Sequence, residues 1–221
     1  MFNKEDDCID NPKSEFCKEI VAKTLANSNL YRLEIPDDGN CFFYSIRAWI
    51  LLNKYNGLAV NGTPLLKMKH GDIRKFVVAY GQANTVVLRP FYEFNNNSLT
   101  NSKKDEHIRD ALGQLKKDKS WALGAGDYLP ILAAEALQLN LHIYNWTWRS
   151  KEHGEYYEIP IIVNPDLPIA TILRINNNHY DLLMPLESAK ENVINKFNEI
   201  KKSIKTAGGR RLNRTRKTNR L

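Results

Sequence analysis

One cysteine of this chain lies in a setting suited to nucleophilic catalysis. Cys41 follows Asp38, Gly39 and Asn40, and it precedes a dense apolar run that extends to Leu52. This run is too long and too free of breakers to be a strand, so we expect a buried helix that begins at or beside Cys41. Unbonded amides and the positive end of the dipole at a helix N-terminus favour a thiolate.

The residues before the cysteine are expected to shape an oxyanion loop. Gly39 permits a tight turn, and Asp38 can accept hydrogen bonds from loop amides and fix their direction. Backbone amides near Asn40 and Cys41 would then stabilise a negative oxygen, each by about 3 kcal/mol in acyl-transfer enzymes. Taken alone, an Asp-Gly turn before a buried cysteine is also common in proteins without such activity.

A second polar cluster supplies a partner for the thiol. His179 and Asp181 flank Tyr180 at the start of the apolar run 182–184. If Tyr180 points into the core, strand alternation places His179 and Asp181 on one face. The imidazole would act as general base and acid, and the carboxylate would orient and charge it. The alternative is a surface hairpin with a solvated histidine, unless folding brings Cys41 to His179.

Helical patterns dominate the first part of the chain and strand patterns follow. Helices are predicted from Asp10 with Pro12 in the first turn, over 42–52, after Asp72 as N-cap, over 105–116, over 128–138 with Asp127 as N-cap, and over 187–204. Strands are predicted over 31–35, 139–148, 155–163, 171–175 and 182–184. This order indicates an α+β domain with a small central β-sheet packed between helices.

The chain is long enough for one folded domain with an extension at each end. We expect a helical segment over 1–29, the domain that carries the site over 30–187, a closing helix over 188–205, and a disordered basic tail over 206–221.

The net charge of +7 arises from the tail. Nine of the 32 Lys and Arg residues lie in 201–221, which holds no acid, so the first 200 residues carry 23 basic and 25 acidic residues and a net charge of −2. The body therefore has no basic character of its own. The tail leaves an acidic partner, a membrane surface, a transport receptor or a nucleic acid open as contacts.

Cysteine and histidine usage argues against cross-linking and metal binding. Cys8, Cys17 and Cys41 are too few for a disulfide framework and form no C-x-x-C pair, so a reducing compartment is expected. The histidines lack zinc-site spacings, and no metal or cofactor is expected. A charged N-terminus and the absence of a long apolar run indicate a soluble protein that acts in the cytoplasm or elsewhere inside a cell.

The two polar clusters resemble those of the ovarian-tumour (OTU) family of cysteine deubiquitinases. That family carries an Asp-Gly-Asn-Cys loop that opens a long helix and a His-Tyr-Asp run on a late strand, and both are present here in that order, at 38–41 and 179–181. Trp121, the turn at Gly124 and the segment 133–144 also resemble its central region. The resemblance covers roughly residues 30 to 186 and implies a papain-like OTU fold.

The resemblance also implies roles for individual residues. Cys41 would be the nucleophile, His179 the general base and acid, Asp181 its orienting carboxylate and Asp38 the organiser of the oxyanion loop. The implied reaction is thiol-dependent hydrolysis of isopeptide or peptide bonds at the C-terminal glycine of ubiquitin or a ubiquitin-like modifier, through a thioester. The resemblance implies that a monomer can carry out this reaction without a cofactor.

Substrate recognition is less sharply defined than the chemistry. Trp146, Trp148 and Tyr180 are candidate substrate-binding residues, with core packing as the alternative for the tryptophans. A catalytically silent ubiquitin-binding module and a cysteine protease or transferase with another acceptor remain open. The sequence leaves the linkage preference and source organism open, including a bacterial or viral effector delivered into a host cell.

Overall fold

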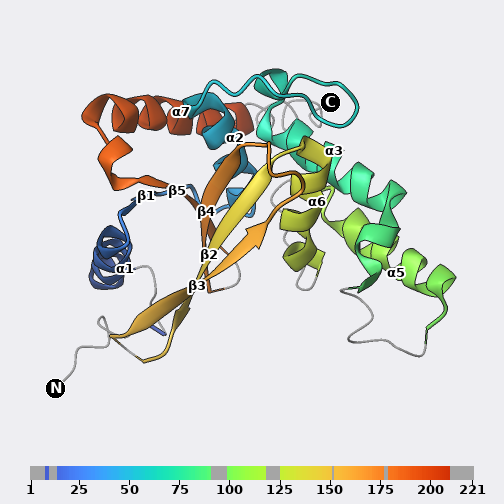
Figure 1. Ribbon diagram of the computed structural model, residues 1–221, viewed down its shortest axis with the longest axis horizontal. Coiled ribbons are helices and arrows are strands. Elements are labelled where there is room, and N and C mark those ends of the chain that lie inside the picture. Colours follow the sequence, from blue (N-terminus) through green and yellow to red (C-terminus); the bar gives the residue numbers. More distant parts are fainter. Residues whose placement is uncertain are drawn as a thin grey trace, which may run out of the picture.

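The computed structural model describes residues 8–9, 14–90, 99–117, 125–150, 152–176 and 179–209. At its centre, the described part of the chain forms a five-stranded sheet with the order β1-β5-β4-β2-β3 (Figure 1). Its strands are β1 Leu30–Leu33, β2 Asn140–Trp148, β3 Gly154–Ile161, β4 Ile169–Ile175 and β5 His179–Pro185. Strands β2 and β4 are parallel, and the other neighbours are antiparallel.

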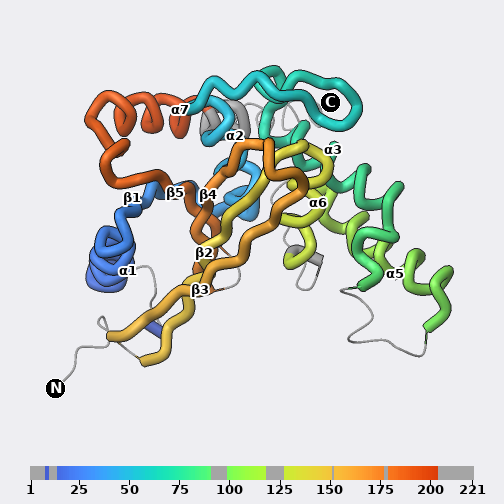
Figure 2. The backbone as a smooth tube through the Cα atoms, in the orientation of Figure 1, coloured from blue at the N-terminus to red at the C-terminus, as the bar shows by residue number. Residues whose placement is uncertain are grey.

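Helices pack against both faces of this sheet. They are α1 Glu15–Asn27, α2 Cys41–Leu52, α3 His70–Ala83, α5 Asn101–Gln114, α6 Leu129–Leu137 and α7 Glu191–Gly209. Helix α1 packs one side of the sheet through Val21 and Leu25, which meet Trp146, Leu173 and Leu183. The larger core joins α2, α3 and α6 to the other side, and the tube in Figure 2 shows α1 apart from these helices. The predicted α+β class, with a sheet between helices, is therefore confirmed.

Helix α2 begins at Cys41, as its apolar run predicts. Most of its side chains are buried because the helix contacts β5, α3 and α7 at once. Phe42 meets the ring of Tyr180 edge-on at 5.1 Å, which ties the first turn of α2 to β5. The core thus fixes the first turn of the helix that carries the cysteine.

Three helix starts differ from the prediction. Helix α1 is capped by Ser14, and the expected Asp10 and Pro12 lie outside the described residues. Helix α3 starts two residues before Asp72, whose carboxylate accepts from the Lys69 amide at 3.2 Å from within the first turn. Helix α6 has Tyr128 and not Asp127 at its N-cap position, and Asp127 forms an ion pair with Arg174.

The C-terminal helix also differs from its prediction. Residues 186–188 form a short 3-10 turn, and α7 then runs from Glu191 to Gly209. Helix α7 therefore includes residues 206–209, the first four residues of the tail that was predicted to be disordered. Residues 210–221 lie outside the described residues.

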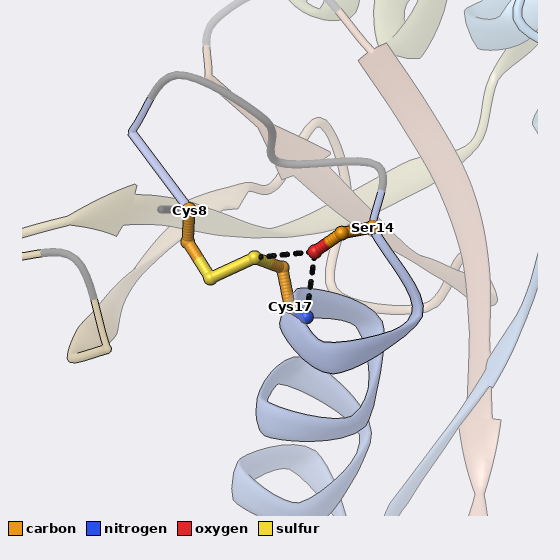
Figure 3. Close-up of a disulfide and its surroundings, with 3 residues drawn as sticks. All are labelled: Cys8, Ser14 and Cys17. Atoms are coloured by element: carbon orange, nitrogen blue, oxygen red, sulfur yellow. Dashed lines mark hydrogen bonds between the residues drawn. A yellow bond between two sulfur atoms is a disulfide. The ribbon is translucent and has the colours of Figure 1, made fainter. Parts of the chain in front are cut away.

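Two cysteines are joined in a disulfide, which the sequence did not predict. Cys8 and Cys17 are both fully buried, with Cα atoms 5.5 Å apart (Figure 3). The Ser14 hydroxyl donates to Cys17 Sγ at 2.9 Å and accepts from the Cys17 amide at 3.2 Å. The expectation that the cysteines stay reduced is wrong for this pair, because their Cα atoms lie within the range that an S–S bond spans. Cys41 keeps its thiol.

Among the described helices, none is both long enough and apolar enough to cross a membrane.

We expect Cys8→Ser to lower the free energy of unfolding by about 2–3 kcal/mol, because the cross-link closes a short loop in the unfolded chain. Urea denaturation of oxidised protein measures this loss. Reductant should produce the same loss in the wild type and none in the variant. A wild type that is insensitive to reductant would contradict the cross-link.

Candidate active site

The chain leaving β1 brings the two polar clusters together. Strand β1 pairs with β5 only from Leu182 to Pro185, so the following segment passes beside residues 179–181 on its way to Cys41. Its Ile35 amide donates to Asp181 Oδ1 at 2.7 Å, which ties this segment to the start of β5. Folding therefore supplies the meeting of cysteine and histidine that the sequence left open.

His179 lies between a carboxylate and the cysteine. Its Nε2 is 3.0 Å from Asp181 Oδ1. Burial lowers the pKa of His179, but the hydrogen bond with Asp181 and the interaction with Cys41 outweigh burial and raise it to about 10. Because Nε2 faces Asp181, Nδ1 is the ring nitrogen left to exchange a proton with Cys41.

The carboxylate of Asp181 has no exposed surface and is bonded from three directions. Besides His179 and the Ile35 amide, it accepts from Arg32 Nε through Oδ2 at 2.8 Å. Burial raises the pKa of Asp181, but the hydrogen bond from His179 and the charge of Arg32 more than compensate and hold it below its ordinary value. Asp181 therefore stays charged and orients the imidazole.

Sequence reasoning missed two charged neighbours of the histidine. Arg32 is on β1, 149 residues before Asp181, and only the pairing of β1 with β5 reveals it. Asp37 places Oδ1 3.6 Å from His179 Nδ1, on the side opposite Asp181. The sequence did carry a signal for Asp37, because it is adjacent to Asp38 and lies two residues before the glycine of the cysteine loop.

Asp38 holds the loop before the cysteine. Its Oδ1 accepts from the Asn40 amide at 3.1 Å, and its Oδ2 accepts from the Tyr44 hydroxyl at 3.3 Å. Gly39 has a φ of 79°, a left-handed conformation that explains the glycine at this position. The Asn40 amide, which the sequence predicts near the oxyanion, is thus bonded to Asp38 in this structure. The first-turn amides of α2 have no acceptor within the helix.

The three predicted substrate-binding aromatics do not form a common surface. Trp146 and Tyr180 have no exposed surface and belong to two different cores, and Trp148 is partly exposed. The rings of Trp146 and Trp148 meet edge-on at 5.2 Å. Trp146 and Tyr180 are thus core residues in this structure. The predicted Trp121 and Gly124 lie outside the described residues.

Comparison with known proteins finds similarity in solved structures. No family model matches the chain, and no curated protein matches it. The OTU domain of OTUD1 matches over 76% of this chain and 93% of its own, with 19% identity and a TM-score of 0.48. The chain is similar to OTU domains. Because the TM-score lies below 0.5, the function is argued from the geometry of the site.

Two further structures have similar scores. The viral OTU domain protease from Taggert virus matches over 76% of this chain and 85% of its own, with 15% identity and a TM-score of 0.45. An OTU deubiquitinase from Wolbachia pipientis wMel matches over 76% of this chain and 96% of its own, with 15% identity and a TM-score of 0.46.

We expect NMR titration to give His179 a pKa of about 10. Asp181→Asn and Cys41→Ala should each lower it, because each removes an interaction that stabilises the imidazolium. The stability that His179 contributes should be complete below its ordinary pKa of 6.5 and should be lost as pH rises towards 10. An identical pKa in the wild type and both variants would contradict this arrangement.

We expect Arg32→Met to lower the free energy of unfolding at pH 7 by about 3–5 kcal/mol, because it leaves the buried Asp181 carboxylate without its cation. The lowered pKa of Asp181 means that this stabilisation is present above the ordinary pKa and is lost as pH falls through the lowered value. The difference in free energy of unfolding between the wild type and Arg32→Met should therefore shrink below about pH 4, as measured by denaturant titration.

Arg149→Met is the matched control for this variant. Arg149 pairs with Glu155 at the surface, where both side chains are about half exposed, so its loss should cost about 1 kcal/mol or less. Equal losses for the two arginine variants would contradict the role of Arg32.

Proposed function

We propose that this protein is a cysteine-type deubiquitinase, in which Cys41 is the nucleophile, His179 the general base and acid, and Asp181 the orienting carboxylate. The observation that carries the proposal is His179 itself, which interacts with Cys41 and with the buried Asp181 and has a pKa raised to about 10 by both. This is the relation of nucleophile, base and orienting acid that acyl transfer requires.

The proposed reaction proceeds in two halves. Cys41 thiolate attacks the carbonyl carbon of the substrate's terminal glycine, and the carbonyl oxygen takes up the negative charge beside the first-turn amides of α2. The tetrahedral intermediate collapses, His179 gives its proton to the departing amine, and a thioester remains. Water then gives a proton to His179 and attacks the thioester, which releases the carboxylate product and the thiolate.

Two features support ubiquitin or a ubiquitin-like modifier as the substrate. The Asp-Gly-Asn-Cys loop and the His-Tyr-Asp run resemble those of OTU deubiquitinases. Cys41 is only 1% exposed, so access to its sulfur is narrow and suits an extended chain that lacks side chains next to the reacting bond. A tail that ends in two glycines has this property.

The remaining expectations belong to the same proposal. The protein would act as a monomer inside cells. The basic residues of 210–221 would provide an accessory contact with an acidic partner, a membrane surface or a transport receptor, separate from catalysis.

A ubiquitin that ends in a propargylamide tests the nucleophile. We expect a covalent adduct detectable by mass spectrometry, because a thiolate placed at the terminal carbonyl position adds to the alkyne. Cys41→Ala should form none, and Cys8→Ser should react as the wild type does, which separates the nucleophile from the cross-linked cysteines. Absence of an adduct with ubiquitin and with ubiquitin-like modifiers would contradict the enzyme and leave a binding module.

A further inference from the structure

An arginine lies in the core beside the cysteine loop. Arg74 is on α3, and its side chain is 1% exposed. A guanidinium stays charged in proteins, and arginine is rarely buried to this extent without partners that replace its water. The groups that Arg74 contacts should therefore show why a charge is kept there.

The guanidinium of Arg74 binds three backbone carbonyls from two separate segments. Its NH2 group donates to the carbonyl of Gly39, and its NH1 group donates to those of Leu115 and Lys117 at 3.0 and 3.2 Å. The central carbon of the guanidinium, Cζ, lies 4.6 Å from the centre of the Phe43 ring. Arg74 thus contacts the chain two residues before Cys41 and again two residues after it.

The contact with Gly39 fixes one peptide unit at both ends. The carbonyl oxygen of the Gly39–Asn40 peptide accepts from Arg74, and the amide of the same peptide donates to Asp38 Oδ1 at 3.1 Å. In a planar trans peptide these two groups point in opposite directions. Rotation of this peptide would therefore break both bonds, so Arg74 and Asp38 together hold its orientation.

The orientation matters because this peptide immediately precedes α2. A carbonyl oxygen turned towards the first-turn amides would occupy or repel the place where the substrate oxygen becomes negative. We propose that Arg74 is a positioning residue, which keeps the Gly39 carbonyl turned away from the oxyanion site. This inference rests on the acyl-transfer function proposed above.

The choice of arginine supports a positioning role over simple packing. A buried charge stabilises a core no better than a well-packed apolar side chain, and often less well. The planar fork of arginine, however, binds several carbonyls in fixed directions, which neither methionine nor lysine can do.

Arg47 offers a matched control. It is half-buried on α2 and donates to the carbonyls of Leu65 and Leu66 at 3.1 and 3.0 Å, so it ties α2 to the short 3-10 helix Leu65–Lys67. That 3-10 helix is separate from the loop that precedes Cys41. Arg47→Met therefore removes a similar set of bonds without touching the oxyanion loop.

The test compares two reactions of Cys41 in the wild type, Arg74→Met, Arg74→Lys and Arg47→Met. Acylation by p-nitrophenyl acetate passes through an oxyanion, whereas alkylation by iodoacetamide at a saturated carbon does not. We expect both Arg74 variants to lower the acylation rate 10- to 100-fold and to change the alkylation rate less than about threefold, since removal of an oxyanion donor costs rates of this order or more. Arg47→Met should leave both rates near the wild-type values, and thermal unfolding reports whether each variant is folded.

Ubiquitin cleavage by the same variants separates this inference from the proposed function. In Arg74→Met we expect a lower kcat for a ubiquitin substrate with little change in KM. A wild type that acylates normally but does not cleave ubiquitin would overturn the substrate proposal and leave the role of Arg74 standing on the two small reagents. The positioning role of Arg74 would be overturned by equal losses of acylation and alkylation, by unfolding of both Arg74 variants, or by a Cys41 that is inert to both reagents.

Discussion

The carboxylate of Asp181 is the interaction on which the candidate site depends. It is completely buried, and a charge in such a place persists only when its surroundings replace water. The amide of Ile35, the guanidinium of Arg32 and the imidazole of His179 do so from two elements and the segment that joins β1 to α2. The same bonds that keep the carboxylate charged therefore also set the position of the histidine.

A second buried charged group plays a comparable part at the loop that precedes Cys41. Arg74 is buried beside Phe43 and holds the Gly39 carbonyl, while Asp38 holds the amide of the same peptide. The described site thus contains two buried charged groups, one anionic and one cationic. In both cases, groups from distant parts of the chain take the place of solvent around the buried charge.

Local patterns revealed much of this arrangement in advance. The apolar run after Cys41 was long enough to specify a helix. Strand alternation would place His179 and Asp181 on one face if Tyr180 pointed into the core, and in the structure Tyr180 is buried and His179 contacts Asp181. Arg32 and Arg74 escaped notice because their partners lie far away in sequence and no short spacing marks them. The Cys8–Cys17 disulfide was missed because a spacing of nine residues does not by itself indicate that two cysteines lie close enough to bond. Tyr180 and Trp146 were expected at a binding surface, but the packing of helices on both faces of the sheet buries them.

The pairing of β1 with β5 has a consequence for the moment at which the protein becomes reactive. Arg32 and Asp181 are 149 residues apart, so the edge strand can close on β5 only after most of the chain has left the ribosome. Contacts of such long range form late, because the chain must first lose the entropy of a large loop. The nascent chain contains Cys41 early, but it has no oriented imidazole beside that sulfur. Completion of the sheet therefore delays the pairing of Cys41 with an oriented imidazole until the domain has folded.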